Sequence, residues 1–575
     1  MNTSAVRHLS YYPFVQALAR LKARFHLEAA AEDLAACTLV WWKRTNPGEK
    51  HTVPMRVSIS NSRTDQWAAE VSFPEEAHYI KYGFCLTDRA GKSAWYNTCG
   101  FHDAETCDGS FEILQINETD VLRLPAWSQG CVYYQIFPER FAKSGSINGS
   151  FDAWDAAPTR ENFLGGNLKG IIDRLPYLDE LGIECIYLNP IFLGDFNHKY
   201  ATTDYFKIDP LFGTEPDLME LVEKAHTLGI RVILDGVFNH VGIHFAPFMD
   251  FMEKGGKSAY RDWFYPKQYP IRIEPACYEC VGDYPYMPRL NGANEAVRSY
   301  VQQVLLYWLE HAHIDGWRFD VADELDRHAV TIWREAVKRA YPDALILAET
   351  WGDASRLLGP DGFDSAMNYL FRDAVIDFFA LGTITPDQFK DRLDSMRMRY
   401  PEEINLSMYN LLGSHDTARF LTEAKGESWR LRLAMAFQML FPGAPAIYYG
   451  DELGMTGEND PGCRGGMAWD APDEALHQWQ KDLIALRKKH ACLRTGTYRV
   501  LYARESLFAF QRASENDRVT AVFNTGCAPQ TLDLTDAEEP VHIPPRSVKI
   551  ISSKDHKEEK PCVPSQESSL SCLPA

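Results

Sequence analysis

Three acidic residues stand far apart along the chain, each beside a short apolar run or a histidine. Asp320 ends the run 316–320, Glu349 follows the run 345–348, and Asp416 comes directly after His415. Breaking an acetal between two sugars requires one carboxylate that attacks the anomeric carbon or stabilises its positive charge, and one carboxyl group that protonates the leaving oxygen. These residues therefore predict a glycoside-cleaving site that needs neither a metal nor an organic cofactor.

The segments that must position these residues are of two alternating kinds between about residue 126 and residue 490. Short apolar, β-branched runs are followed by amphipathic stretches of helical length, which is typical of βα units around a parallel sheet. The runs are 132–137, 185–188, 232–234, 314–319, 345–348, 366–369, 408–412 and 446–449, and the helices expected between them include 217–228, 295–311 and 429–440. Eight such runs predict the α/β class and a closed (β/α)8 TIM barrel.

Doubly wound sheets share this alternation, so the placement of the acidic residues decides between the two folds. Asp235, Asp320, Glu349 and the pair His415-Asp416 lie at or just beyond the C-terminal ends of the third, fourth, fifth and seventh runs. Active sites of (β/α)8 barrels form at that end of the strands. The barrel is therefore favoured over an open sheet.

Composition divides the chain into four regions. Residues 1–125 contain strand-like runs separated by turn residues and predict an N-terminal β-sandwich. Residues 126–490 form the predicted barrel, which includes a small inserted domain at 241–293 after the third strand. Residues 491–553 predict a smaller C-terminal β-sandwich, and residues 554–575, rich in Ser, Lys, Glu and Pro, predict a disordered tail.

Charge and cysteine usage exclude several classes of function. The 575 residues include 59 basic and 79 acidic side chains, a formal charge of −20, which argues against binding to nucleic acid or anionic membranes. No run reaches the roughly 18 apolar residues of a membrane span, and residues 1–14 lack a signal-peptide pattern, so a cytoplasmic protein is predicted. The odd number of cysteines, 13, and their scattered positions predict that most are free thiols.

Together with the segment 235–240, the three acidic contexts resemble the four signature regions of the α-amylase family, glycoside hydrolase family 13, in the same chain order. Strings at 134–141, 198–200, 287–291 and 454–464 resemble one subgroup, the neopullulanases, cyclomaltodextrinases and maltogenic amylases. That subgroup carries an additional N-terminal β-domain. The resemblance extends over almost the whole chain.

The resemblance implies roles for individual residues. Asp320 would be the nucleophile, Glu349 the general acid and base, and Asp416 a residue that favours the distorted sugar ring of the transition state. Asp235 would support the site structurally without touching the reacting bond. The residues implied in substrate binding are Tyr200, His240, Arg318, Trp351, His415, Asp460 and Arg464, with Asp204 and Asn239 as further candidates.

Departures from the family pattern are also informative. Many relatives bind calcium through acidic residues at two positions that here are Gly145 and Asn167, so we expect the calcium site to be lost. Asp323, Thr350 and Gly352 also differ from the subgroup, beside the place expected for the leaving sugar. Substrate preference is therefore less constrained by the resemblance than reaction type.

The function implied is a retaining α-glucan hydrolase that cleaves α-1,4 bonds in cyclodextrins, pullulan and maltodextrins, with some transglycosylation; cleavage of α-1,6 bonds stays open. The resemblance also implies a homodimer in which residues 1–125 reach over the partner's barrel. Two alternatives are a transglycosylase or isomerase of the same superfamily and a non-catalytic glucan-binding barrel. The string 287–291 argues against the first, and the three carboxylates argue against the second.

Overall fold

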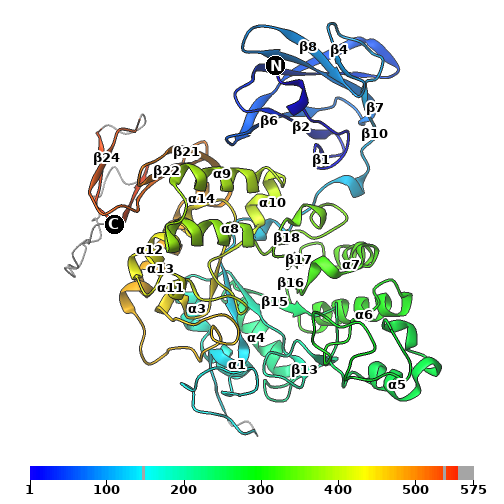
Figure 1. Ribbon diagram of the computed structural model, residues 1–575, viewed down its shortest axis with the longest axis vertical. Helices are drawn as coiled ribbons and strands as arrows, with labels where there is room; N and C mark the ends of the chain where they lie inside the picture. Colours follow the sequence, from blue (N-terminus) through cyan, green and yellow to red (C-terminus); the bar gives the residue numbers. More distant parts are fainter. Residues whose placement is uncertain (146–148, 535–538, 554–575) are drawn as a thin grey trace.

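Eight parallel strands form a barrel at the centre of the structure (Figure 1). The computed structural model describes residues 1–145, 149–534 and 539–553, and the tail predicted to be disordered, 554–575, lies outside them. The barrel strands are β11 (Tyr133–Ile136), β12 (Cys185–Leu188), β15 (Arg231–Gly236), β16 (Gly316–Phe319), β17 (Leu345–Ala348), β18 (Ser365–Ala366), β19 (Tyr409–Leu411) and β20 (Ala444–Tyr448).

The strand order is that of a closed barrel. The strands pair in the order β18-β17-β16-β15-β12-β11-β20-β19, and a parallel bridge between Met367 and Tyr409 joins the two ends. The predicted (β/α)8 barrel is confirmed. One run differs from the prediction, because β18 covers only two residues and the helix α8 already begins at Tyr369.

The barrel strands read as continuous apolar runs because both of their faces are covered. In β12, Tyr187 points into the barrel interior, where it packs with Ile233, Leu345 and Tyr409. The neighbouring Ile186 belongs instead to the core between the strands and the surrounding helices. All four residues of β12 are buried. A period of two is therefore invisible in the hydropathy of these strands, although their side chains alternate.

The helices that surround the barrel follow the order of the chain. Several begin with side-chain caps; Thr214 and Asp217 form a capping box at the start of α4. The helices are α1 (Pro138–Phe141), α2 (Leu168–Asp173), α3 (Leu175–Leu181), α4 (Glu215–Thr227), α6 (Glu295–His311), α7 (Arg327–Ala340), α8 (Tyr369–Val375), α9 (Pro386–Arg397), α10 (Glu402–Ser407), α11 (Phe420–Glu423), α12 (Ser428–Leu440), α13 (Glu474–Lys489) and α14 (Ala491–Thr495), with a π-helical segment at Ile376–Leu381.

Two excursions leave the barrel on the side where its strands end. After β12, the strands β13 (Phe192–Gly194) and β14 (Thr202–Ile208) form a small antiparallel sheet. After β15, the segment 241–293 contains α5 (Ala246–Lys254) and the short 3-10 turns Gly255–Lys257 and Arg261–Trp263. The second excursion is the one predicted as an inserted domain.

The N-terminal region consists of two antiparallel sheets. One has the order β1-β2-β6-β5 and the other β4-β3-β7-β8-β9, with β10 paired to β7. Alternate residues of β2, from Ala23 to Ala29, face a shared core with Ile80, Tyr82 and Phe84 of β7. The strands are β1 (Val15–Ala19), β2 (Lys22–Ala30), β3 (Leu34–Lys43), β4 (Asn46–Pro54), β5 (Arg56–Ser60), β6 (Thr64–Ser72), β7 (His78–Asp88), β8 (Ser93–Asn97), β9 (Gly100–His102) and β10 (Phe111–Gln115).

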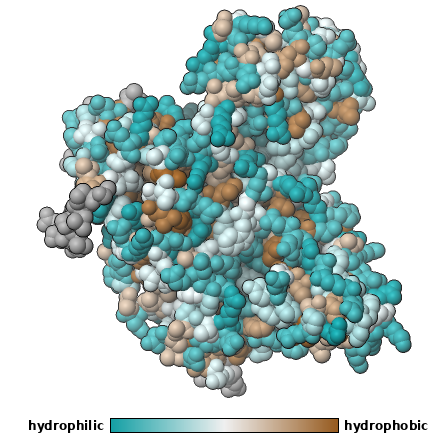
Figure 2. All heavy atoms as spheres, viewed as in Figure 1, coloured by the Kyte–Doolittle hydropathy of each residue, from teal (hydrophilic) through white to brown (hydrophobic). Residues whose placement is uncertain are grey.

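The N-terminal domain stands out from the barrel as a separate lobe and rests on α9 and α10 (Figures 1 and 2). Arg24 and Gln16 both donate to Glu403 of α10, at 3.1 Å and 2.9 Å. On α9, Asp391 accepts hydrogen bonds from the backbone and hydroxyl of Ser62, the latter at 2.8 Å. The contact is polar and touches the outer wall of the barrel.

The C-terminal region is a second antiparallel unit, predicted as the smaller sandwich. Its strands are β21 (Thr497–Arg504), β22 (Leu507–Ala513), β23 (Arg518–Asn524), β24 (Gln530–Leu532), β25 (Val541–Ile543) and β26 (Ser547–Ser552). They form a four-stranded sheet, β21-β22-β23-β26, and a two-stranded sheet, β24-β25. Within the described ranges, no disulfide joins the cysteines and no helix has the length and hydropathy to cross a bilayer.

Candidate active site

The three predicted acidic residues meet at the C-terminal ends of the barrel strands. Asp320 directly follows β16, Glu349 directly follows β17, and Asp416 lies in the loop after β19. The backbone amide of Glu349 donates to the carbonyl of Phe319 at 3.0 Å, so the fourth and fifth strand ends are tied side by side. Asp320 and Glu349 are only 5% and 6% exposed.

One guanidinium holds three carboxylates together. Arg318, fully buried on β16, donates from Nη1 to Asp235 at 2.9 Å and to Asp320 at 2.8 Å. Its other terminal nitrogen, Nη2, lies 3.2 Å from Oε2 of Glu349. Arg318, which the resemblance placed among the binding residues, is thus the centre of the site.

The balance of charge in this cluster favours the uptake of a proton. Burial raises the pKa of Asp320 well above its usual range, against the opposing effect of Arg318, and the neighbouring Glu349 and Asp235 add to the rise. Burial also raises the pKa of Asp235. Since three carboxylates share one cation, the proton belongs to the cluster as a whole. Such a cluster can keep one carboxyl group protonated while another stays ionised.

Asp235 is held from below the site. Tyr187 donates its hydroxyl to Oδ2 of Asp235 at 2.6 Å, and Tyr200 donates to the same oxygen at 2.9 Å. The carboxylate is 1% exposed, and both of its oxygens lie near Arg318. With its acceptor sites used in this way, Asp235 fits the structural role that the sequence suggested for it.

His415 and Tyr200 form a stacked pair beside Asp416. Their rings are 5.4 Å apart and nearly parallel, and the Tyr200 hydroxyl lies 2.6 Å from Nε2 of His415. Gln135 donates its amide to Nδ1 of His415 at 2.8 Å, which leaves the hydrogen of a neutral imidazole on Nε2. That nitrogen lies 3.0 Å from Oδ2 of Asp416. Because the Tyr200 hydroxyl gives its own hydrogen to Asp235, the Nε2–H of His415 is shared between that hydroxyl and Asp416.

A chain of ion pairs leads from Asp416 outward. Arg464 contacts Asp416 at 3.1 Å and Asp460 at 2.7 Å, and Arg160 contacts the other oxygen of Asp460 at 2.9 Å. Burial would raise the pKa of Asp416, but His415 and Arg464 outweigh it and hold that pKa below the usual range. Asp416 stays ionised in conditions where the Asp320 cluster takes up a proton.

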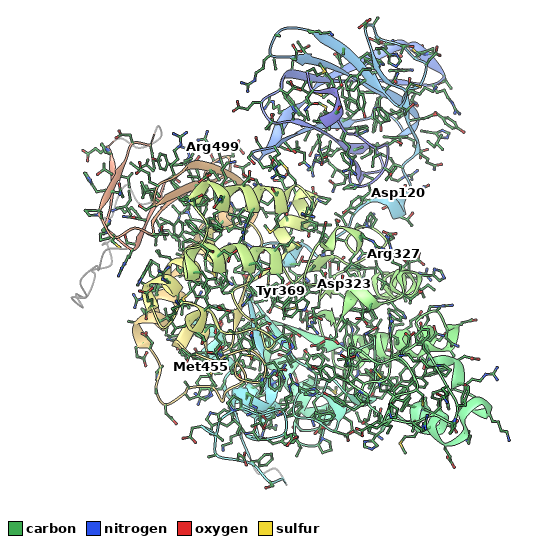
Figure 3. All side chains as sticks on the ribbon, viewed as in Figure 1. Asp120, Asp323, Arg327, Tyr369, Met455 and Arg499 are labelled. Carbon is green, nitrogen blue, oxygen red and sulfur yellow. The ribbon has the colours of Figure 1, made fainter. Side chains whose placement is uncertain are left out.

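His240 and Trp351 border the carboxylates on two sides. Both ring nitrogens of His240 are buried without a hydrogen-bond partner among the described residues, and Nε2 lies 4.0 Å from Asp320. Trp351 donates its indole N–H to Oε1 of Glu349 at 3.0 Å and stacks on Tyr369, labelled in Figure 3, with ring centroids 4.2 Å apart. The indole is 52% exposed, so one of its faces remains open.

All the binding residues implied by the resemblance except the two further candidates contact this cluster or one another. Asp204 pairs instead with Lys207 at 3.0 Å, and Asn239 donates to Glu324 at 3.1 Å. Sequence reasoning missed Gln135 and Asn189, which bind His415 and Tyr200. Both lie at the C-terminal ends of barrel strands, so the rule that identified the carboxylates could also have found them.

The region of the expected calcium site does not fit a calcium ion. Asn167 is fully engaged, because its amide donates to the Ser144 carbonyl at 2.9 Å and its oxygen caps α2 by accepting from Gly170 at 2.7 Å. The ammonium of Lys143 lies nearby, 5.4 Å from the ring of Trp154. A hard dication prefers several carboxylate oxygens, and these residues supply none.

Activity is therefore expected to survive chelation. Full activity after exhaustive dialysis against EDTA, with no gain on adding calcium, is the expected result because no acidic ligand remains at Gly145 or Asn167. Turnover of β-cyclodextrin before and after dialysis measures it. A chelated protein that is inactive until calcium is restored would contradict the prediction.

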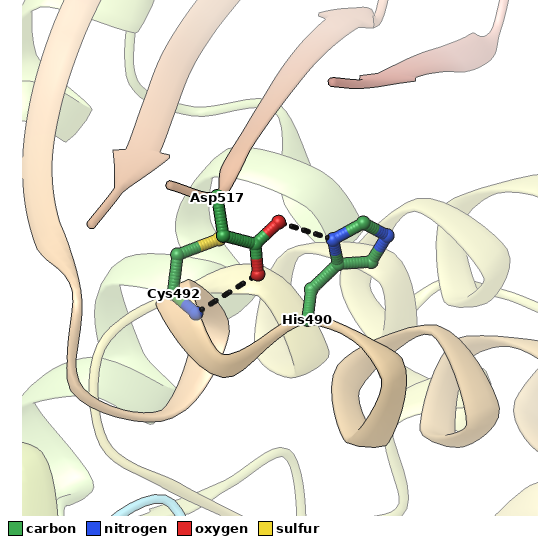
Figure 4. A group of neighbouring side chains, drawn as sticks. All are labelled: His490, Cys492 and Asp517. Atoms are coloured by element: carbon green, nitrogen blue, oxygen red, sulfur yellow. Dashed lines mark hydrogen bonds and ion pairs between the residues drawn. The ribbon is translucent and has the colours of Figure 1, made fainter. Parts of the chain in front are cut away.

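One other buried group could suggest a metal site. His490, Cys492 and Asp517 lie together where α13 meets the C-terminal sheet (Figure 4). The His490 ring contacts Asp517 at 2.8 Å, and the amide of Cys492 donates to the other carboxylate oxygen at 3.4 Å. Both oxygens of Asp517 are therefore already used. We interpret the group as a structural link between the two domains.

Comparisons with known proteins agree with this geometry. The sequence profile described as "Alpha amylase, catalytic domain" matches residues 135–489, and the one described as "Alpha amylase, N-terminal ig-like domain" matches residues 1–117. The chain is 39% identical over 548 residues to a cyclomaltodextrinase of Thermoanaerobacter pseudethanolicus (strain ATCC 33223 / 39E), which covers 94% of this chain and 95% of that protein. It is 40% identical over 545 residues to neopullulanase 2 of Thermoactinomyces vulgaris, with 92% of each covered. A solved cyclomaltodextrinase structure matches with a TM-score of 0.89 at 38% identity, covering 94% of each chain.

Proposed function

This chain belongs to the α-amylase family of glycoside hydrolases, within the cyclomaltodextrinase and neopullulanase group, and on that premise we propose that it is a retaining hydrolase of short and cyclic α-glucans. The proposed substrates are cyclodextrins, maltodextrins and pullulan, cleaved at α-1,4 bonds with some transfer to sugar acceptors. Cleavage of α-1,6 bonds is to be decided by the product analysis described below.

The contact of Asp320 and Glu349 with the two terminal nitrogens of one guanidinium carries this proposal. Nη1 of Arg318 lies 2.8 Å from Asp320, and Nη2 lies 3.2 Å from Glu349. Retaining glycosidases need their two carboxyl groups only about 5–5.5 Å apart, whereas inverting ones need room for a water between them. Two carboxylates on one guanidinium suit the shorter separation.

The proposed reaction proceeds by double displacement. The carboxylate of Asp320 attacks the anomeric carbon while the bond to the leaving oxygen breaks, and Glu349 gives its proton to that oxygen. Glu349 then takes a proton from water, whose oxygen attacks the same carbon and releases Asp320. The shared guanidinium supports this sequence, because Arg318 contacts both carboxyl groups and stabilises the negative charge that passes from Asp320 to Glu349 during the first displacement.

Other residues are proposed to bind the sugar that reacts. Asp416, kept ionised, would accept hydrogen bonds from sugar hydroxyls and stabilise the positive charge of the transition state. Within the described part of the chain, the two buried ring nitrogens of His240 have no hydrogen-bond partner, which suits a hydroxyl supplied by substrate. Tyr200 would stack under the ring, and the open face of Trp351 would receive the leaving sugar.

Side-by-side product analysis tests the proposed substrates. β-Cyclodextrin, pullulan and soluble starch are incubated with equal amounts of enzyme, and products are identified by chromatography. We expect fastest hydrolysis of β-cyclodextrin. Panose or isopanose from pullulan would indicate α-1,4 cleavage, whereas maltotriose would indicate α-1,6 cleavage. A protein that binds β-cyclodextrin but hydrolyses none of the three would instead support the non-catalytic glucan-binding barrel.

The anomeric configuration of the first product is expected to be retained. Proton NMR during early hydrolysis of β-cyclodextrin should therefore detect the α-anomer before mutarotation, because two successive inversions restore the starting configuration. Early appearance of the β-anomer would exclude Asp320 as a nucleophile, although a hydrolase with a different mechanism would remain.

We also propose a cytoplasmic homodimer. The absence of disulfides among the cysteines of the described ranges suits a reducing compartment. In the proposed dimer, the N-terminal domain reaches over the partner's barrel and narrows access, so that small glucans enter more readily than starch. The exposed position of the domain on the outer wall of its own barrel leaves it available for this role.

Deletion of residues 1–120 is expected to weaken dimerisation and to reduce the preference for β-cyclodextrin over starch. Light scattering after size exclusion measures the mass, and the ratio of the two kcat/KM values measures the preference. Glu403→Gln in the full-length protein is the control, because it loosens the docking contact without removing the domain. A full-length monomer that still prefers β-cyclodextrin would refute the dimer as the cause.

A further inference from the structure

Val321, the residue after Asp320, has a left-handed backbone conformation. Its φ is 46° and its ψ is 49°, although it is neither glycine nor asparagine. A β-branched side chain in this region clashes with its own backbone, so the conformation costs free energy and persists only where surrounding contacts impose it. Because Val321 directly follows Asp320, this strain lies beside a proposed reacting group.

The left-handed turn places two successive amides on Glu349. The amide of Val321 donates to the side-chain oxygen Oε2 of Glu349 at 2.8 Å. The next amide, that of Ala322, donates to the backbone carbonyl of Glu349 at 3.1 Å. The loop that follows Asp320 is therefore fastened to the other carboxylate through both its main chain and its side chain.

These contacts make the two oxygens of Glu349 unlike each other. Oε2 accepts a hydrogen bond from the Val321 amide and lies 3.2 Å from Nη2 of Arg318, with which it forms an ion pair. A proton is disfavoured on an oxygen that accepts from an amide and lies against a guanidinium cation, because both contacts stabilise negative charge there. Among the residues that the structure describes, Oε1 accepts only from the indole of Trp351, at 3.0 Å, and that indole is 52% exposed.

We propose that Val321 is a positioning residue whose strained amide fixes Oε2 of Glu349, so that Oε1 is the oxygen that gives its proton to the leaving sugar. The amide also stabilises the carboxylate that remains after proton transfer. This inference rests on the proposed function of Glu349 as the general acid.

Other charged or titratable groups also surround Glu349 and must be held constant in a test. Arg318 and Asp320 belong to β16 and its end, while Asp323 and Tyr369, both labelled in Figure 3, lie on the 3-10 turn after Asp320 and at the start of α8. A change confined to one backbone amide leaves all four in place. Side-chain substitutions in the cluster would not.

The experiment replaces the amide of Val321 with an ester. Nonsense suppression with the α-hydroxy analogue of valine removes the N–H and keeps the side chain, and kcat/KM for β-cyclodextrin is measured across pH. We expect the alkaline limb to move upward by about one pH unit, because a hydrogen bond to a carboxylate is worth about that much. We also expect kcat to fall more than KM changes, since positioning is lost in the transition state.

Two controls distinguish the loss of the Val321 hydrogen bond from a general change in the loop after Asp320. The same ester at Ala322 removes a hydrogen bond to the Glu349 backbone, not to its carboxylate, and should leave the limb in place. Val321→Gly keeps the amide and relieves the strain, so the alkaline limb of its kcat/KM profile should also stay at the wild-type pH. An unshifted limb in the Val321 ester, or equal shifts in all three proteins, overturns the inference. Wild-type protein without hydrolytic activity would instead refute the proposed function.

Discussion

Replacement of Asp320 by asparagine is expected to lower kcat on β-cyclodextrin by roughly 10⁴-fold or more, since no carboxylate would remain to form the glycosyl-enzyme. The fold should tolerate the change, because asparagine is nearly isosteric and its oxygen can still accept from Arg318. A neutral asparagine at this buried position also avoids the desolvation penalty of a carboxylate. Steady-state kinetics and thermal unfolding, measured on the same preparation, give the two readouts.

Glu349→Gln should lower kcat to a similar extent on substrates with a poor leaving group, because glutamine cannot supply the proton. The matched control is Asp262→Asn, at an exposed position in the segment 241–293, which should leave kcat unchanged. If both Asp320→Asn and Glu349→Gln retain more than a few per cent of wild-type turnover, the assignment of the two roles is wrong.

Arg318→Met is expected to remove activity and to destabilise the fold by about 3–5 kcal/mol at neutral pH, the cost of leaving buried carboxylates without their cation. Asp235, Asp320 and Glu349 all lose a partner at once. Urea unfolding monitored by tryptophan fluorescence measures the loss. Arg318→Lys keeps the positive charge but loses the planar, forked set of N–H donors of the guanidinium. It should recover part of the stability and little activity.

The same variant should be less destabilised at pH 5 than at pH 8. Burial raises the pKa of Asp320 and Asp235 in the folded state, and loss of the guanidinium removes the largest effect that opposes it. A carboxyl group whose pKa is raised by folding binds more protons in the folded state, so its destabilising effect is relieved as pH falls. Equal losses at both pH values would mean that the carboxylates do not sense Arg318 in this way.

The sequence was sufficient to predict the barrel and the convergence of its acidic residues. Asp320 and Glu349 could be placed together because the ends of parallel strands share one edge of the sheet, whatever the loops do. The run 366–369 was less informative. A short apolar run does not by itself distinguish a strand from a helix. Here Asn368 caps a helix by accepting a hydrogen bond from the amide of Phe371 at 3.2 Å.

Contacts between loops could not be predicted, because they depend on backbone conformations that no local pattern encodes. Nothing in the sequence around Val321 indicates a left-handed residue, since valine is disfavoured there. The stacking of Trp351 on Tyr369 joins two different strand ends, and the bond from Gln135 to His415 joins two others. The docking of Arg24 on Glu403 likewise required the positions of two separately folded regions.

The arginine at the centre of the site also limits how this protein can evolve. Because Arg318 contacts the proposed nucleophile, the proposed acid and the supporting Asp235, one substitution there alters all three functions together. Variation can accumulate without that penalty only in the loops, such as the one that carries Thr350 and Gly352, and new substrate ranges are more accessible to this lineage than new reactions.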